Sequence, residues 1–335
     1  MRIAVIGLGV AGSYLLRRLG VEHEVVGFER QPYDQFKAVC AWGTSNNEMR
    51  KLMSRVEISF DEYLLHEGRS LTVDLGHEVL NIPLIGLCTY DKHRLELDLA
   101  RGFKTYYGVK PSMDYLTREF DLVVDATGVA RAYLPKPQLD EVIPCIEYRV
   151  DYGGAPPMDD FYIKPFPNDT GYLWYFPLED GVGHVGAGDV MLRHVKSVEE
   201  FNMRYPGVPL AKLGRAVRFT PPEFCRPFYV GKVVGVGESI GTVYPLLGEG
   251  IIPSLHCAEI FCETLPDLQA YERRVLETFQ IFSDVHRLVK LKHESKLSLW
   301  RHLPLLYRVY RYMKEREERF GILIRAEDFR KIIIN

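Results

Sequence analysis

Three glycines and one acid near the start of the chain have the types and spacing of a dinucleotide-binding site. Gly7, Gly9 and Gly12 fit the pattern G-x-G-x-x-G, and Glu29 follows Gly7 by 22 residues. In such a motif the first glycine permits a tight turn, the second lets the backbone approach a pyrophosphate, and the third allows a helix to pack closely on a strand. A carboxylate about 20 residues further on can accept hydrogen bonds from ribose hydroxyls. An acid in that place argues against the 2′-phosphate of NADP, but the motif does not distinguish FAD from NAD as the cofactor.

The motif works only where a strand leads into the glycine turn and a helix follows it, and the sequence has this order. Residues 2–6 form a short apolar run that predicts a buried strand, and residues 13–19 predict a helix. Residues 24–28 predict a second strand, which ends at Glu29. The helix N-terminus would offer free N–H groups and the positive end of its dipole to a pyrophosphate. This context is more specific than the glycine pattern alone.

The rest of the chain shows two patterns of strands. Residues 121–128 and 232–237 predict buried strands of the parallel type. Short runs separated by Gly, Pro, Asn and Asp predict an antiparallel sheet, and they lie at 145–150, 160–166, 172–177 and 184–189. We therefore expect an α/β protein in which a doubly wound domain is interrupted by a β-sheet domain.

Local signals place a hairpin and several helices. The alternation at 71–75 and 78–82 predicts a hairpin around Gly76. Helices are expected at 90–102 with Asp91 as N-cap, at 197–205 with Ser197 as N-cap, at 244–262, and over most of the chain after residue 268.

Composition narrows the class of protein. The chain has 335 residues, of which 47% are hydrophobic and 26% charged, as in ordinary globular proteins. A net charge of −3 argues against a nucleic-acid partner. Six cysteines occur without a C-x-x-C pair, so we expect no metal site. The first strand begins at residue 2 and no run of 18 apolar residues occurs, so we expect a cytoplasmic protein without a signal peptide or membrane span.

Four blocks, in order along residues 1–262, resemble the FAD-dependent oxidoreductases of the hydroxylase superfamily. They are most similar to its geranylgeranyl reductase branch, which saturates isoprenoid double bonds. The blocks are the glycine motif with Glu29 and Arg30, Val-Cys-Ala-Trp-Gly at 39–43, Tyr-Leu-Trp-Tyr-Phe-Pro at 172–177, and Gly-Glu-Ser-Ile-Gly at 237–241 followed by Tyr-Pro-Leu-Leu-Gly-Glu-Gly-Ile at 244–251.

The resemblance implies a fold and its domain boundaries. The fold would be a Rossmann-like FAD-binding domain with an inserted antiparallel β-sheet substrate domain and a helical C-terminal region. These parts would comprise residues 1–48, 88–142 and 225–267 for FAD, 49–87 and 143–224 for substrate, and 268–335 for the helical region.

The resemblance also implies a role for individual residues toward FAD. Ala11 and Gly12 would meet the pyrophosphate, and Glu29 the adenosine ribose. Gly250 and Ile251 would direct backbone N–H groups at the flavin's N1 and C2 carbonyl, where a helix dipole stabilises the negative charge of reduced flavin. The full set of expected cofactor-binding residues is Gly7, Gly9, Ala11, Gly12, Glu29, Arg30, Cys40, Ala41, Gly43, Lys92, Arg94, Val109, Gly128, Gly237, Glu238, Gly248, Gly250 and Ile251.

The chain departs from the branch at several of these positions. Glu238 stands where the branch has Asp, so its ribityl contact is one methylene longer. Lys92 aligns with an arginine that reaches the cofactor, and Arg94 could reach it as well. The adenine contact falls near Val109, in a stretch shorter than that of the branch. The whole chain is also shorter than most relatives, which reduces the substrate domain.

The substrate side is expected near Tyr172, Trp174 and Phe176. These side chains lie two apart on one strand, so they share a face and could form an apolar cavity wall or ordinary core. Cys40 is the candidate catalytic residue, because a thiol beside the flavin could position substrate or assist proton delivery. The alternative is that Cys40 is a small packing residue against the ring.

The segment 283–319 combines a net charge of +5 with many Leu, Tyr and Trp residues. Such a surface could contact an anionic leaflet at the inner membrane face, where lipid substrates reside. The alternative is a helical cap on the FAD domain with a solvated basic face.

Three functions follow from these features. The first is reduction of carbon–carbon double bonds of a prenyl or other apolar substrate by hydride transfer from reduced flavin. Because a second G-x-G-x-x-G with its own βαβ unit is absent from the sequence, NAD(P)H would bind transiently or a ferredoxin-like protein would supply the electrons. The second function is that of an FAD-dependent monooxygenase or halogenase-like enzyme. The third is a non-catalytic flavoprotein that binds a lipid or a protein partner.

Overall fold

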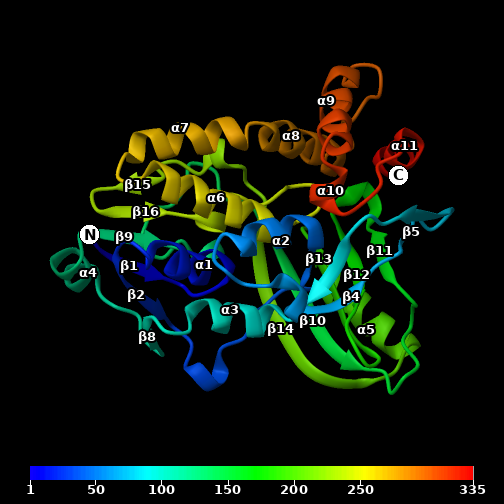
Figure 1. The fold of residues 1–335 in the computed structure, drawn as a ribbon. Helices are drawn as coiled ribbons and strands as arrows, with labels where there is room; N and C mark the ends of the chain where they lie inside the picture. The colour runs from blue at the N-terminus through cyan, green and yellow to red at the C-terminus, as the bar shows by residue number, and fades with distance from the viewer. Residues whose placement is uncertain (335) are drawn as a thin grey trace.

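The computed structural model of the protein describes residues 1–334, and two large β-sheets form its frame (Figure 1). The first sheet has six strands in the order β15-β16-β9-β1-β2-β8. Its strands are β1 (Arg2–Ile6), β2 (Glu24–Glu29), β8 (Lys104–Tyr107), β9 (Leu122–Asp125), β15 (Tyr229–Val230) and β16 (Val233–Gly235). Neighbours are parallel except for the β15–β16 pair. The expected doubly wound sheet is therefore present.

Helices cover this parallel sheet and bury its central strand. Ile3, Ala4 and Val5 of β1 are fully buried, as expected for a strand covered on both faces. Helix α1 (Val10–Leu19) packs against α3 (Lys92–Ala100) and α6 (Ile251–Thr264), and α7 (Leu268–Thr278) packs on α6. The short helix α4 (Met113–Glu119) precedes β9. The hydroxyl of Tyr14 on α1 donates to Glu259 on α6 at 2.6 Å, which ties the two helices together.

The second sheet has seven strands in the order β14-β10-β13-β12-β11-β5-β6. They are β5 (Ser70–Asp74), β6 (Val79–Pro83), β10 (Val142–Asp151), β11 (Phe161–Pro165), β12 (Gly171–Pro177), β13 (Val182–Asp189) and β14 (Val208–Arg218). Only β11 and β5 pair in parallel, and the predicted hairpin around Gly76 is β5–β6. One face packs against helix α5 (His194–Arg204) through Tyr175, Val185 and Phe201. The opposite face is left to form a wall of the site.

A small third sheet connects the two large ones. It comprises β3 (Gly43–Ser45), β7 (Leu87–Tyr90) and β4 (Leu64–Glu67), with β7 in the middle. Helix α2 (Asn46–Ser54) follows β3, and the hydroxyl of Ser45 caps it by accepting from the N–H of Glu48. The loop before β3, which carries Cys40, is thereby held against the seven-stranded sheet.

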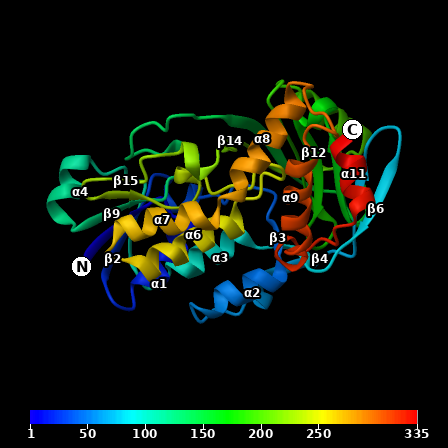
Figure 2. The same cartoon turned by 90° about the horizontal axis from the view of Figure 1, so that it is seen from above.

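Four helices complete the described chain: α8 (Ile281–His293), α9 (Leu303–Lys314), α10 (Glu317–Phe320) and α11 (Ala326–Ile334). In the view from above, α9 and α11 lie on the same side of the molecule as β12 and β6 (Figure 2). The carbonyl of Gly321 accepts from the N–H groups of Ile85 and Leu87, at 2.9 and 3.1 Å, and Leu323 donates to Pro83. These bonds fasten residues 321–323 of the C-terminal region to β6, to β7 and to the segment between them. Within residues 1–334, none of the helices combines the length and apolarity needed to cross a bilayer.

Of the two N-cap residues predicted from the sequence, one caps its helix and the other does not. Asp91 caps α3 as expected, because its carboxylate accepts from the N–H of Arg94 at 2.9 Å. The predicted N-cap at Ser197 is wrong. Helix α5 begins at His194, and the Ser197 hydroxyl donates back to the carbonyl of Arg193. The start lies earlier because Asp189 accepts from the backbone N–H of Arg193 and orders the turn that leads into the helix.

Candidate functional site

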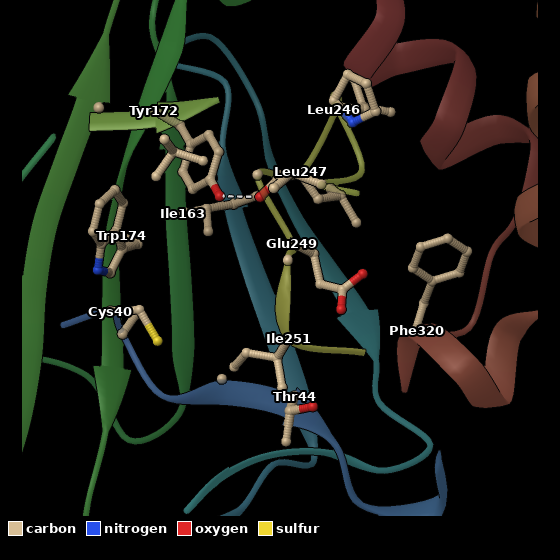
Figure 3. Close-up of a pocket in the computed structure, with 18 of the residues that line it drawn as sticks. Cys40, Thr44, Ile163, Tyr172, Trp174, Leu246, Leu247, Glu249, Ile251 and Phe320 are labelled. Carbon is tan, nitrogen blue, oxygen red and sulfur yellow. Dashed lines mark hydrogen bonds between the residues drawn. The ribbon is translucent and has the colours of Figure 1, made fainter. Parts of the chain in front are cut away.

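A cavity of about 440 Å³ lies between the two large sheets and the C-terminal helices (Figure 3). It begins at the glycine turn after β1 and continues along the inner face of the seven-stranded sheet. The predicted site residues that line it are Gly9, Ala11, Cys40, Ala41, Gly43, Lys92, Gly128, Tyr172, Trp174, Phe176, Glu238, Gly248, Gly250 and Ile251. Residues predicted for cofactor and for substrate thus border the same space.

The glycine turn has the geometry that the motif requires. Gly7 has a φ of +88°, and a Cβ added to it would lie 2.7 Å from the carbonyl oxygen of Ala126. A Cβ on Gly12 would lie 1.8 Å from the carbonyl oxygen of Gly7, so only glycine fits there. Gly9 is the N-cap of α1 and lines the cavity, so the N-terminus of this helix opens toward it. Such an end can receive a pyrophosphate.

Glu29 stands at the carboxyl end of β2, beside the turn. Its buried carboxylate accepts from the backbone N–H groups of Leu8 and Gln31, each at 3.0 Å. Val109 donates its N–H to the carbonyl of Glu29 at 2.9 Å, so the two predicted adenosine-side residues are neighbours. Arg30 is exposed at the surface. These three residues lie beside the turn and outside the lining of the cavity.

Lys92 and Arg94 point in different directions from the start of α3. The ammonium group of Lys92 lies 2.5 Å from Oε1 of Glu96, and both side chains are buried. Although burial opposes its charge, the Glu96 carboxylate holds the pKa of Lys92 above its ordinary value. The pair adjoins the glycine turn, since a Cβ on Gly9 would lie 4.0 Å from Oε1 of Glu96. Arg94 instead stacks over the ring of Tyr63 at 4.9 Å, near the surface.

The loop of residues 39–43 places Cys40 in the cavity wall. The Trp42 N–H donates to the Cys40 sulfur at 3.4 Å, and the Trp42 indole N–H donates to the carbonyl of Ala38 at 2.9 Å. Burial raises the pKa of the Cys40 thiol, so the neutral form is favoured. Gly43 permits close packing on β12, because a Cβ there would lie 2.4 Å from the ring of Phe176.

Glu238 is held toward the antiparallel sheet by two groups of β14. Its carboxylate lies 3.0 Å from the guanidinium of Arg215 and accepts from the backbone N–H of Arg218 at 3.0 Å. A Cβ on Gly128 would lie 2.8 Å from this carboxylate. Gly237, with a φ of +77°, turns the chain so that it approaches Ala11. Arg215 has no counterpart among the predicted site residues.

The turn before α6 forms the opposite side of the cavity. Gly250 is the N-cap of α6, and Ile251 is its first residue. One oxygen of Glu249 accepts from the N–H of Ile252 at 3.0 Å, and the other pairs with Arg319 at 2.6 Å. The Tyr172 hydroxyl donates to the carbonyl of Leu247 at 2.5 Å (Figure 3). The contact between Glu249 and Arg319 was missed by sequence reasoning, because 70 residues separate the two.

Beyond Cys40 most of the cavity wall is apolar, although the charged residues Asp169, Arg325 and Asp328 also line it. Tyr172 and Trp174 lie with ring centroids 5.7 Å apart, and Figure 3 shows Trp174 next to Cys40. The walls continue with aliphatic and aromatic side chains of the sheet and of the C-terminal helices, namely Leu71, Val73, Ile82, Ile163, Met313, Phe320, Ile324, Phe329, Ile332 and Ile333. The contribution of residues 313–333 was also missed, although the helical region itself was expected.

Comparison with known proteins gives distant relatives and a shared fold. No protein-family model matches the chain. It is 24% identical over 310 residues to an uncharacterized protein of Methanocaldococcus jannaschii, across 78% of this chain and 82% of that protein. It is 27% identical over 155 residues to digeranylgeranylglycerophospholipid reductase 2 of Methanothermobacter thermautotrophicus, across 42% of this chain and 40% of that enzyme.

Solved structures share the architecture over nearly the whole chain. A geranylgeranyl bacteriochlorophyll reductase-like protein from Thermoplasma acidophilum has a TM-score of 0.70 at 17% identity, over 100% of this chain and 96% of that one. A flavin-dependent brominase has a TM-score of 0.66 at 13% identity, over 99% of this chain and 98% of that one. A probable FAD-dependent monooxygenase from Pseudomonas aeruginosa has a TM-score of 0.61 at 13% identity, over 88% of this chain and 96% of that one. The chain therefore has the fold of the Rossmann-type FAD-binding flavoproteins, and its predicted resemblance to the geranylgeranyl reductase branch is confirmed.

Proposed function

We propose that the protein is an FAD-dependent oxidoreductase that reduces carbon–carbon double bonds of a prenyl lipid. The observation that carries this proposal is the continuity of the cavity, which runs from the dinucleotide turn into an apolar chamber. A cofactor laid along the turn would have its reactive end at Cys40 and Trp174. An apolar substrate in the chamber would meet it there.

The residues at the turn fit FAD. Gly7 and Gly12 leave no room for side chains, the N-terminus of α1 opens on the cavity, and Lys92 supplies a buried cation beside it. Glu29 retains lone pairs for ribose hydroxyls after its two backbone contacts. At the other end, the N-terminus of α6 at Gly250 and Ile251 favours negative charge. When bound and reduced, FAD supplies a hydride to a nearby electron acceptor.

The chamber fits a prenyl chain better than a small polar substrate. Most of its wall consists of Leu, Ile, Val and Phe side chains from β5, β6, β11 and the C-terminal helices, with Asp169, Arg325 and Asp328 as charged members. Burial of an apolar chain is worth about 0.8 kcal/mol for each CH₂ group. The C-terminal helices would therefore bind substrate as well as cover the sheet.

Anaerobic reoxidation tests this function against its rivals. The purified protein, loaded with FAD and reduced with dithionite, should be reoxidised by geranylgeranyl diphosphate in the absence of oxygen, and the product should be two hydrogens heavier. A monooxygenase or halogenase-like enzyme, which the similar folds of such enzymes favour, would turn over only with oxygen. Flavin that stays reduced without oxygen, together with no modified product when oxygen is admitted, would indicate a non-catalytic lipid- or protein-binding flavoprotein.

The electron donor can be found with the same sample. We expect either NAD(P)H, bound transiently, or a ferredoxin-like protein to reduce the bound FAD. Stopped-flow reduction by NADH, by NADPH and by a reduced ferredoxin distinguishes the donors. The donor whose rate matches or exceeds turnover is the physiological class.

A further inference from the structure

A buried acid–histidine pair lies in the wall of the cavity, beside the Cys40 loop. Nδ1 of His184 on β13 lies 2.8 Å from Oε1 of Glu147 on β10, and the two residues are only 1% and 4% exposed. Among the described residues, neither the second carboxylate oxygen of Glu147 nor Nε2 of His184 has a hydrogen-bond partner. Burial of such groups is costly. In a wall made largely of apolar side chains, the pair therefore calls for a functional explanation.

The strand register brings Glu147 to the same space as Trp174 and Cys40. Glu147 lies opposite Gly186, and Gly186 lies opposite Trp174 on the next strand. A Cβ on Gly186 would lie 2.4 Å from the Trp174 ring, so the indole rests over this glycine. Glu147, Trp174 and Cys40 all line the cavity, and Figure 3 shows the last two side by side.

Trp42 closes the other side of the pair. Its ring centroid lies 4.8 Å from that of His184, and Trp42 is 6% exposed. Its backbone has a φ of 60°, a left-handed conformation that is uncommon for a bulky residue. The Trp42 indole thus covers His184, which is not among the cavity-lining residues, whereas Glu147 is one of them.

We propose that Glu147 donates the proton that completes double-bond reduction, and that His184 positions Glu147 and restores its proton. This inference rests on the proposed function. One alkene carbon gains a hydride from the reduced flavin, and the other gains the proton of Glu147. The alkene would take up two electrons and the flavin would lose two. His184 would pass the proton at Nδ1 to the Glu147 carboxylate and regain one from water that enters when the product leaves. Cys40 is left with a positioning role toward the substrate.

Other ionisable groups lie around the pair. Burial raises the pKa of the Cys40 thiol, and it raises the pKa of Cys145 to about 12. Lys92 and Arg215 are already paired with Glu96 and Glu238. Two more groups face the pair. Arg149 on β10 stacks on the Trp42 ring at 5.7 Å, and burial raises the pKa of Tyr172 on β12.

Single-turnover kinetics of variants test the proposal. Holoenzyme reduced with dithionite is mixed anaerobically with geranylgeranyl diphosphate, and flavin reoxidation is followed from about pH 5 to pH 9. We expect Glu147→Gln to slow reoxidation at least ~100-fold, as for loss of a general acid, and Glu147→Asp to recover part of the rate. His184→Asn should slow it ~10-fold or more and change the pH profile. Affinities for FAD and for geranylgeranyl diphosphate, titrated on the oxidised enzyme, should stay within about twofold of wild type.

A second acid–histidine pair provides the matched control. Nε2 of His66 lies 3.1 Å from Oδ1 of Asp160, and neither residue is among those that line the cavity. His66→Asn should leave the rate and its pH profile unchanged.

If wild type is reoxidised and Glu147→Gln is equally fast, the inference is overturned while the proposed function stands. If wild type is not reoxidised, both fall. If Glu147→Gln loses FAD, the test uses Glu147→Asp instead. The proposal is then overturned if Glu147→Asp is reoxidised as fast as wild type and His184→Asn has an unchanged pH profile.

Discussion

Glu29 is the side chain expected to hold the adenosine ribose. Its carboxylate is fixed by two backbone N–H groups, and a charge-assisted hydrogen bond to a hydroxyl is worth ~1.5–3 kcal/mol. Glu29→Ala should therefore weaken FAD binding about tenfold to a hundredfold, as measured by titration of the cofactor-free protein. Glu24→Ala, which removes an exposed acid of the same strand, is the control. Unchanged affinity for Glu29→Ala would place the ribose elsewhere.

The Cys40 thiol provides a pH-dependent signal in the cavity wall. Burial raises its pKa above the ordinary value of ~8.5, so the reactive thiolate is scarce at neutral pH and forms only as the pH rises. In the cofactor-free protein, alkylation of Cys40 by iodoacetamide should be slower at neutral pH than alkylation of a free cysteine, and it should accelerate only at more alkaline pH. Peptide mass spectrometry measures the modification, with Cys40→Ala as the blank. Rapid alkylation near pH 7 would reveal an activated thiolate and return the proton chemistry to Cys40.

At the scale of elements, the sequence predicted those whose signals are local. The turn at Gly7, the hairpin β5–β6 and the cap of α3 at Asp91 each depend on neighbours within a few residues. The start of α5 was missed because the side chain of Asp189, five residues earlier, orders its first turn. Strand β14 was not predicted, although its register with β10 brings Arg215 to the cavity.

The lining of the apolar chamber was beyond sequence reasoning. Phe329 on α11 meets the same space as Ile163 on β11, yet nothing in either segment shows that they pack around one cavity. The same holds for Glu147 and His184, which come together only through strand pairing. The predicted cofactor motifs are short contiguous stretches of sequence, whereas the apolar part of the cavity is assembled by tertiary packing.

If α11 forms a wall of the substrate chamber, as proposed above, two of its residues should respond differently to substitution. Phe329 lines the chamber, whereas Ile334 is 49% exposed. Phe329→Asp places an unpaired carboxylate in an apolar space, so the affinity for geranylgeranyl diphosphate should fall at least ~10-fold, while FAD affinity stays unchanged. Ile334→Asp should change neither. Equal prenyl affinities for both variants would show that the chain binds elsewhere.

At the scale of the whole molecule, apolar side chains in and just before α9 differ in exposure. Leu305, Leu306 and Val309 of α9 are buried, whereas Leu303 and Tyr307 of α9 are exposed by 56% and 58%, and Trp300, in the turn before the helix, by 89%. These exposed side chains lie among the basic residues of segment 283–319, the arrangement on which the hypothesis of a contact with an anionic membrane rests.

Vesicle binding decides between this contact and a solvated helical cap. The protein should float with vesicles that contain phosphatidylserine and bind less to neutral ones. A variant with Trp300→Ser and Leu303→Ser should lose most of its vesicle binding and keep its FAD. The control Val21→Ser changes a residue that is 83% exposed elsewhere on the surface, and it should bind vesicles as wild type does. Equal flotation of the double variant and wild type would leave α9 as a cap.

The identity of the bound cofactor tests the central claim most directly. The turn at Gly7 to Gly12, Glu29 and the N-terminus of α6 are together expected to hold one molecule of FAD in the cavity. The protein should therefore be yellow after purification or after reconstitution, and denaturation should release a chromophore with the mass of FAD in a one-to-one ratio. Release of FMN or NAD, or failure to retain FAD after reconstitution, would contradict the account.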